Sequence, residues 1–237
     1  MIKVDTVLFD LDGTLLPMEQ KEFIRAYFGE LARRCAPLGY EREPLIAALW
    51  KGTSAMIAND GVVDNKARFW EVFLQELGER AQELDAELED FYATDFNRVK
   101  QVVRAPQDVR GLLTTLRAKG YGVALASNPI FPAVALRARL AWVGLGAEDF
   151  DLATSYENSA YCKPNPKYFS EIFAQLGKRG EQCLMVGNNP RDDMAAAQVG
   201  AQVFLLTDYL ENEQGLDISP YPHGDFAALV RLIEALP

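Results

Sequence analysis

The stretch Val7-Leu8-Phe9-Asp10-Leu11-Asp12-Gly13-Thr14-Leu15 organises the whole chain, because an apolar run leads straight into two aspartates and a Gly-Thr turn signal. An apolar run that stops at a turn signal is typical of a buried strand. Asp10 and Asp12 then lie at the carboxyl end of that strand, where open α/β sheets place their ligands. Two neighbouring carboxylates repel each other, so they require a cation, a shared proton or a charged substrate.

Length and composition set the scale of the protein. The chain has 237 residues, 49% of them hydrophobic, which suffices for one large domain or a core with a smaller second unit. The net charge of −10, with no Lys/Arg block, argues against a nucleic-acid surface. We expect no secretory signal and no membrane span. The cysteines lack CxxC spacing, which favours a reduced, cytoplasmic protein without structural zinc.

Residues 16–103, called the helical block below, show helical periodicity and no convincing strand pattern. Apolar stripes at helical spacing occur in four places. The first ends at Pro37 and Gly39, and the third begins at the predicted N-cap Asp64 and stops at Gly78. The four predicted helices lie around residues 23–35, 45–50, 64–77 and 84–92.

From Ala105 onward, strand and helix patterns alternate. Strands are predicted at 121–126, 150–154, 183–186 and 202–206, and helices at 107–119, 133–143, 167–176, up to Val199, and 226–236. This alternation predicts a parallel sheet with right-handed crossovers. The fold class is therefore α/β, with a Rossmann-like parallel-sheet core (residues 1–15 and 104–237) and an inserted α-helical domain (residues 16–103).

Four polar clusters follow the predicted strands: Asp10 with Asp12, Ser127 with Asn128, Lys163, and the segment from Asn188 to Asp193. Because carboxyl ends of parallel strands meet at one edge, we expect these clusters to form one site. Taken singly, each has a simpler interpretation as a turn residue, a helix cap or a solvated lysine. The occurrence of all four clusters in this order favours a functional site. The only histidine, His223, is interpreted as a surface or packing residue of the tail loop.

The order and spacing of these clusters strongly resemble the haloacid dehalogenase superfamily of phosphohydrolases. The resemblance covers nearly the whole chain, and Asp-Leu-Asp-Gly-Thr at residues 10–14 is its most specific part. It implies that the helical block is the superfamily's cap, inserted directly after the first motif. It also implies that Mg²⁺ is held by the Asp10 carboxylate, the Asp12 backbone carbonyl and the cluster containing Asn188 and Asp193.

The residues themselves suit the hydrolysis of a phosphate ester, a reaction that is extremely slow without a catalyst. A nucleophilic Asp10 would split the reaction through an aspartyl-phosphate. Asp12 would protonate the leaving oxygen and then activate water. Ser127, beside a helix start, would donate to phosphate oxygens with Asn128 next to it, and Lys163 would supply positive charge. Mg²⁺ would let an anionic carboxylate approach an anionic phosphate.

One position departs from the family pattern, because Asn188 stands where the family usually has an aspartate. An amide oxygen can coordinate Mg²⁺ but brings no charge, so weaker metal binding is expected. A catalytically weak or inactive phosphate-binding or partner-binding protein therefore stays open as an alternative. A sugar-phosphate mutase also stays open, because it needs the same core residues. Asp12 argues against dehalogenation, which needs no leaving-group acid at that position.

The expected partner is a small phosphorylated metabolite, with no nucleic acid and no membrane. A monomer is slightly favoured, although nothing in the sequence defines the oligomeric state. Specificity is expected to come from side chains of the helical block that face the site. Arg25, Lys51 and Arg68 are candidates from residue type alone.

Overall fold

The computed structural model of the chain describes residues 4–105 and 107–237. Its centre is a six-stranded parallel sheet in the order β3-β2-β1-β4-β5-β6. The strands are β1 (Thr6–Phe9), β2 (Gly122–Leu125), β3 (Leu152–Ala153), β4 (Cys183–Gly187), β5 (Gln202–Leu206) and β6 (His223–Gly224). The predicted α/β class with a parallel sheet is confirmed.

The first strand lies in the middle of the sheet, between β2 and β4, and all four of its residues are buried. Successive side chains of a strand point to opposite faces. Val7 and Phe9 accordingly join the apolar cluster on one face, whereas Leu8 joins the cluster on the other. A strand buried on both faces explains why the sequence reads as an uninterrupted apolar run.

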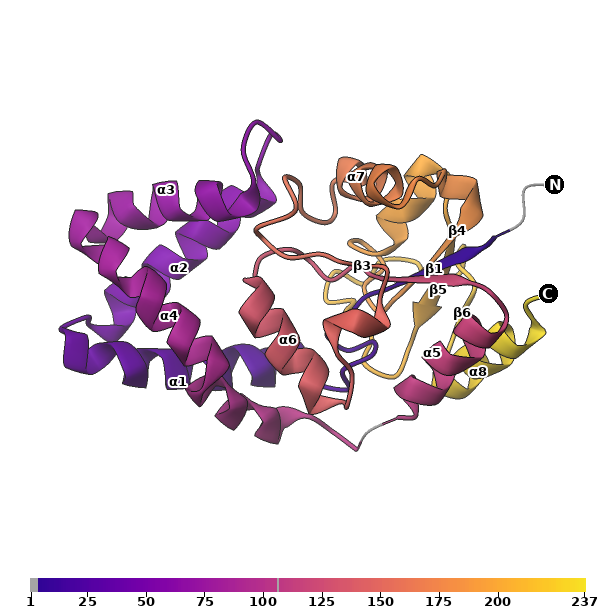
Figure 1. Cartoon of the computed structure of the whole chain (residues 1–237), viewed down its shortest axis with the longest axis horizontal. Coiled ribbons are helices and arrows are strands. Elements are labelled where there is room, and N and C mark those ends of the chain that lie inside the picture. The colour runs from indigo at the N-terminus through magenta and orange to yellow at the C-terminus, as the bar shows by residue number, and fades with distance from the viewer. Residues whose placement is uncertain (1–3, 106) are drawn as a thin grey trace.

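Helices cover both faces of the sheet, with α5 and α8 on one side and α7 on the other (Figure 1). The α-helices are α1 (Gln20–Cys35), α2 (Arg42–Ile57), α3 (Asn65–Leu77), α4 (Leu84–Ala93), α5 (Val109–Ala118), α6 (Ala133–Trp142), α7 (Pro166–Leu176) and α8 (Phe226–Ala235). Short 3₁₀ helices are η1 (Ala36–Leu38), η2 (Glu79–Glu83), η3 (Asp95–Val102), η4 (Ala147–Asp149), η5 (Gly180–Gln182) and η6 (Met194–Val199).

The helical block follows β1 and lies to one side of the sheet in Figure 1. The described chain from Pro17 to Val103 contains no strand, as predicted. The Asp64 side chain caps α3 by accepting a hydrogen bond from Ala67 N at 2.7 Å, which confirms the predicted N-cap. Gly39, just after α1 and η1, adopts a left-handed conformation with φ of 85°, which suits a glycine at a helix end.

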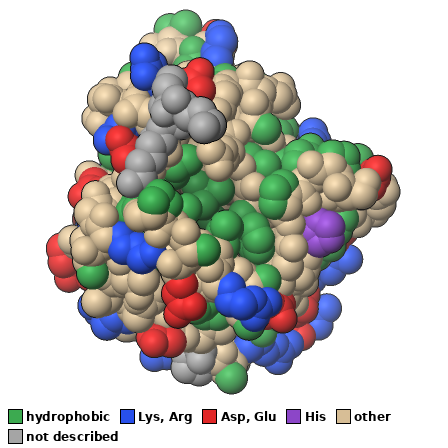
Figure 2. Space-filling model, turned by 90° about the vertical axis from the view of Figure 1, so that its right-hand side faces the viewer, with side chains coloured by type: hydrophobic (Ala, Val, Ile, Leu, Met, Phe, Trp, Pro, Cys, Tyr) green, Lys and Arg blue, Asp and Glu red, His purple; other side chains and the backbone are tan. Residues whose placement is uncertain are grey.

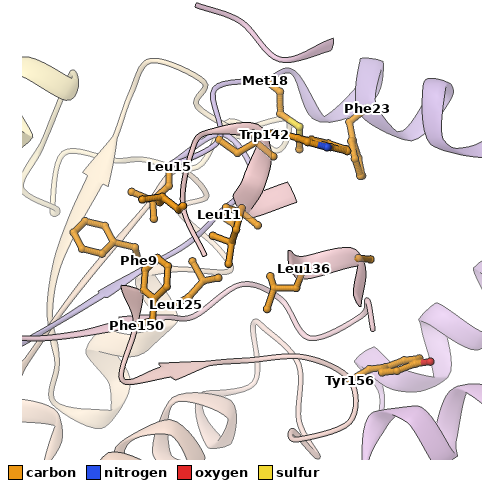
Figure 3. Close-up of a cluster of buried hydrophobic side chains, with 14 of the residues drawn as sticks. Phe9, Leu11, Leu15, Met18, Phe23, Leu125, Leu136, Trp142, Phe150 and Tyr156 are labelled. Carbon is orange, nitrogen blue, oxygen red and sulfur yellow. The ribbon is translucent and has the colours of Figure 1, made fainter. Parts of the chain in front are cut away.

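One apolar cluster runs without interruption from the sheet into the helical block. Figure 3 shows Leu11, Leu15 and Met18 of the segment after β1 gathered with Phe23 of α1 and Leu136 of α6. Helix α6 is therefore packed both on the sheet region and on the block. The division at residues 15 and 104 stays a prediction, because this shared core does not mark a boundary.

Two predictions about the second half of the chain need correction. The segment before Val199 is not a regular α-helix, because its backbone closes i→i+3 bonds such as Ala196 N to Asp193 O at 3.2 Å. His223 is not in a loop, because it pairs with Leu205 in the edge strand β6. Its side chain is exposed, as predicted, and is coloured purple in Figure 2. Among the described residues, no helix has the length and apolarity to cross a membrane.

Candidate active site

A buried lysine joins two of the predicted clusters. Lys163 Nζ lies 2.7 Å from Asp10 Oδ1 and 2.6 Å from Asp193 Oδ1. The Lys163 side chain is only 2% exposed. Asp10 follows β1 and Asp193 follows β4, which are neighbouring parallel strands, so the fold brings both carboxylates to one sheet edge. The predicted meeting of Asp10, Lys163 and Asp193 is thus observed in the structure.

The electrostatics of this group are dominated by burial. Burial raises the pKa of Asp10 to about 8; Lys163 opposes that shift, and the charges of Asp193 and Asp12 add to it. Burial alone would lower the pKa of Lys163, but the two carboxylates raise it above its ordinary value. A further cation near Asp10 would oppose this rise in pKa and favour the ionised form of Asp10.

Asp12 has a partner that the sequence analysis missed. Arg139, on α6, is 1% exposed and donates from Nη1 to Asp12 Oδ2 at 2.5 Å. Its guanidinium also lies 4.5 Å from the centre of the Phe131 ring, a stacking arrangement that holds its plane. The other oxygen, Asp12 Oδ1, is buried and has no hydrogen-bond partner among the described residues. Arg139 therefore holds one oxygen of Asp12, and the second oxygen makes no hydrogen bond within the described chain.

Replacing Arg139 with methionine is expected to affect both stability and activity. The change leaves the partly buried Asp12 carboxylate without its cation, a loss that costs about 3 kcal/mol or more in comparable pairs. We predict a lower Tm and a kcat reduced about 10²-fold, because Asp12 loses its fixed orientation. Arg231→Met is the control, since Arg231 is exposed on α8 and lies away from the site. Equal kcat and Tm in the two variants would contradict this role for Arg139.

Ser127 and Asn128 follow β2 on the loop that leads to α6. The Ser127 carbonyl accepts hydrogen bonds from Thr154 Oγ1 and the Tyr168 hydroxyl, both at 2.7 Å, which fix this loop against the sheet. Asn128 Oδ1 accepts from Lys163 N at 3.2 Å, so Asn128 positions the segment that carries the lysine. Helix α6 begins at Ala133, as predicted, so Ser127 lies on the loop that precedes this helix.

Asn188 follows β4 beside the turn after β1. Its Nδ2 donates to Tyr209 O at 2.6 Å, and its Oδ1 accepts from Thr14 Oγ1 at 3.4 Å. Gly13 has a φ of 76°, and a Cβ there would overlap the Asn188 amide, so only glycine fits this close approach. The amide nitrogen is thus used by the protein, and the carbonyl oxygen is the atom of Asn188 available to a cation.

Further carboxylates surround this edge of the sheet. Burial raises the pKa of Glu211, which follows β5, to about 7, and the charges of Asp12, Asp193 and Asp192 add to the shift. Burial, followed by repulsion from Asp193, also raises the pKa of Asp192. Glu211 was not predicted, although its place after a strand of the same parallel sheet is a signal for it. The group holds more carboxylates than Lys163 can compensate.

This charge balance suits a hard divalent cation. Among the described residues, no three His, Cys, Asp or Glu side chains gather closely enough to hold a metal ion by themselves. A site built on Asp10 and Asp193 would therefore be completed by the Asp12 backbone carbonyl, the Asn188 oxygen and water. Mg²⁺ commonly keeps several waters and takes only one or two protein carboxylates, so this oxygen-donor set fits Mg²⁺.

The parallel sheet, with a carboxylate pair after its central strand and a buried lysine opposite, defines an α/β enzyme with a carboxylate-centred site. The chain belongs to the haloacid dehalogenase-like hydrolases, because the model of that family matches residues 4–200. The predicted superfamily and hydrolase class are thereby confirmed.

Similar proteins agree with this family. The chain is 23% identical to the pyrophosphatase PpaX of Bacillus cereus over 206 residues, covering 87% of this chain and 84% of that one. Its fold is similar to that of a phosphatase of this superfamily from Thermococcus onnurineus, with a TM-score of 0.63 and 20% identity over 97% of this chain and 98% of the other. The hydrolase YfnB of Bacillus subtilis, solved bound to magnesium, gives a TM-score of 0.59 at 16% identity over 98% and 99%. The family and these relatives support phosphohydrolase chemistry in general.

Proposed function

We propose that the protein is a Mg²⁺-dependent phosphatase that hydrolyses a small phosphorylated metabolite through an aspartyl-phosphate on Asp10. The observation that carries the proposal is Lys163, buried between the carboxylates of Asp10 and Asp193 while Asp12 stands two residues beyond Asp10. In this proposal Asp10 is the nucleophile, Lys163 the fixed cation and Asp12 the acid/base at one sheet edge. Phosphatase activity of the named relatives is consistent with it.

In the first step, a carboxylate oxygen of Asp10 forms a bond to phosphorus while the bond from phosphorus to the leaving oxygen breaks. The protonated Asp12 gives its proton to that leaving oxygen, and the alcohol departs. Asp12 Oδ1 is the oxygen for this transfer, because Oδ2 is held by Arg139. Lys163 offsets the negative charge that gathers at the phosphoryl group.

In the second step, Asp12 takes a proton from water as the water oxygen bonds to phosphorus. The bond between phosphorus and the Asp10 oxygen breaks, which releases inorganic phosphate and restores the Asp10 carboxylate. Asp12 ends protonated and ready for the next substrate, so protons and bonds balance over the cycle. We propose that Ser127 and Asn128 bind the phosphate oxygens, because both lie on the loop after β2. Asn128 also accepts a hydrogen bond from the backbone N–H of Lys163.

Mg²⁺, when bound by Asp10, Asp193, the Asp12 carbonyl and Asn188, neutralises the repulsion between the nucleophile and the phosphate dianion. Burial raises the pKa of Asp10, so a bound cation would favour the ionised form that attacks phosphorus. We also propose that residues 16–103 act as the cap over the site, with residues 1–15 and 104–237 as the core. We also propose that the protein is a cytoplasmic monomer whose function involves neither a nucleic acid nor a membrane.

The substrate assay tests this function directly. The wild-type chain should release phosphate from p-nitrophenyl phosphate or from members of a metabolite-phosphate panel with Mg²⁺, and EDTA should stop the reaction. Absence of turnover across a broad panel with saturating Mg²⁺ would reject the phosphatase.

Asn188 favours a second candidate, a catalytically weak protein of the same fold that binds phosphate or a partner. The Asn188→Asp variant separates the two. An aspartate would place a carboxylate oxygen against Tyr209 O, where the amide now donates at 2.6 Å, so metal-free Tm should fall. The added charge should lower the Mg²⁺ concentration for half-maximal activity about tenfold.

Asn189→Asp is the control for Asn188→Asp, because it adds the same charge one residue along the loop. We expect a smaller gain in Mg²⁺ affinity from the control. A large gain in turnover from a nearly inactive wild type would favour the weak protein, and substantial wild-type turnover would exclude it. Equal Mg²⁺ affinity in both variants would show that position 188 does not meet the metal.

A further inference from the structure

A cavity of about 410 Å³ lies where the helical block meets the core. Helices α1 to α4 supply most of its wall, and Ile130–Val134, Arg137, Tyr156 and Glu157 supply the rest. Nine aromatic side chains line it, including Tyr27, Trp70 and Phe131. Its volume is in the range of small-molecule sites, and its lining, as far as the described chain shows, contains none of the predicted catalytic residues.

The interior of this aromatic cavity carries no charge. Its five charged lining residues are exposed or half-exposed at the mouth, and three of them are acidic. Lys66 lies 3.9 Å from Asp85, and the Glu157 carboxylate accepts from Ala133 N at 3.0 Å. Lys66 is thus paired with an acidic residue, which leaves Arg137 as the remaining positive charge among these lining residues. The cavity is therefore unsuited to a second phosphate or a carboxylate and suited to an uncharged group.

One layer of side chains separates the cavity from Asp12. Phe131 forms part of the wall, Arg139 stacks on it at 4.5 Å, and Arg139 holds Asp12 at 2.5 Å. Gln20 and Ile24 line both this cavity and the open groove of about 540 Å³ that contacts Asp192 and Glu211. The first turn of α1 thus separates the aromatic cavity from the acidic edge of the site. Since Asp12 serves the leaving oxygen, the leaving group lies on this side.

Two residues of the cavity lining each carry a buried polar atom without a hydrogen-bond partner in the described chain. The Trp70 side chain is more than nine-tenths buried, and its Nε1 lies near the Tyr156 hydroxyl without making a hydrogen bond of standard geometry to any described residue. Gln20 Oε1 is also buried and lacks a partner within the described chain. Buried polar groups normally have partners, so these atoms point to a bound molecule.

We propose that this cavity binds the leaving group of the substrate, and that this group is flat, aromatic and uncharged. Rings pack favourably against rings, and an acceptor on the ligand would meet Trp70 Nε1 while a donor would meet Gln20 Oε1. The inference rests on the proposed phosphatase, because it assigns the organic part of its substrate. It also predicts that carboxylated or doubly phosphorylated compounds are poor substrates.

The test compares 2-naphthylmethyl phosphate with ethyl phosphate, which both release a primary alcohol, so the chemical step is similar. We expect a kcat/KM about 10²-fold higher for the naphthyl ester, mostly through KM. This ratio should fall at least about tenfold in Trp70→Ala and in Thr53→Phe, which fills the cavity instead of enlarging it. Val62→Ala, an exposed position of the same block, is the control and should keep the ratio.

Binding of the phosphate-free alcohol, 2-naphthalenemethanol, to the Asp10→Asn variant gives a readout that needs no turnover. Calorimetry should show binding that is lost in the Asp10→Asn/Trp70→Ala double variant. If both esters are hydrolysed equally well, the leaving-group inference is wrong and the phosphatase stands. If no ester is hydrolysed but the alcohol binds at Trp70, the phosphatase is wrong and the leaving-group role falls with it. Unchanged binding in the double variant would overturn the assignment of the cavity.

Discussion

Asp10→Asn should reduce phosphate release by about 10⁴-fold or more, because the amide cannot form the aspartyl-phosphate. The side chain keeps its size, and it lies after a strand that is buried on both faces, so the fold should be retained. The measurement is kcat under saturating Mg²⁺ with any ester that the wild type hydrolyses. Asp5→Asn, at the opposite end of the same strand, is the control and should keep full activity.

Although Asp10→Asn should lose activity, its folding stability should exceed that of the wild type over part of the pH range. Because the pKa of Asp10 is raised to about 8, the folded wild type binds this proton more tightly than the unfolded chain does. Its contribution to stability is complete below about pH 4 and is lost as the pH rises through 8. Asparagine removes this dependence, so in EDTA the variant should gain Tm relative to wild type between these limits. A variant with retained kcat, or with a Tm deficit that grows with pH, would contradict our account of Asp10.

Lys163→Met should cost both folding stability and catalysis. Lys163 lies within 2.7 Å of two carboxylates, and its removal leaves Asp10 and Asp193 buried without a shared cation. Loss of one partner from a buried ion pair costs about 3 to 5 kcal/mol, which corresponds to a Tm lower by about 10 °C at this chain length. The kcat should fall about 10³-fold, because the positive charge beside the phosphoryl group is gone.

Two comparisons sharpen the Lys163 result. Lys167→Met changes an exposed lysine on the first turn of α7 and should alter stability by less than about 0.5 kcal/mol. In Lys163→Met, Asp10 loses the cation that opposes the rise in its pKa, so the stability deficit of the variant should shrink as the pH is lowered toward 5. A stability deficit that does not change with pH would mean that lost packing, and not buried charge without a partner, causes the destabilisation.

The parts of the fold that depend on local patterns were predictable from sequence. The apolar run of β1, the Asp64 cap and the glycine after α1 each report a local requirement of the backbone. The predicted site clusters also follow local signals, because each stands at a strand end or on the loop after one. The parallel sheet then brings Asp10, Lys163 and Asp193 together without further information.

The residues that sequence analysis missed depend on contacts between distant segments. Arg139 belongs to an apolar stripe with Leu136 and Leu140 on α6, and only the packing of α6 against the turn after β1 shows its partner Asp12. A charged residue within a buried stripe was the available signal. Glu211 follows β5, but its loop has no motif, and only burial beside Asn189 reveals it. The short strand β6 at His223 likewise depends on pairing with β5.

The most direct measurement of the central claim is chemical trapping of the covalent intermediate. The enzyme is mixed with substrate and Mg²⁺, quenched during turnover, and treated with borohydride, which reduces an acyl phosphate on aspartate to a homoserine side chain. Mass spectrometry of the peptide that contains β1 should then find homoserine at residue 10, with none in the Asp10→Asn variant or without substrate. Phosphate release with an unmodified Asp10, or with the reduced residue at another carboxylate, would contradict the account.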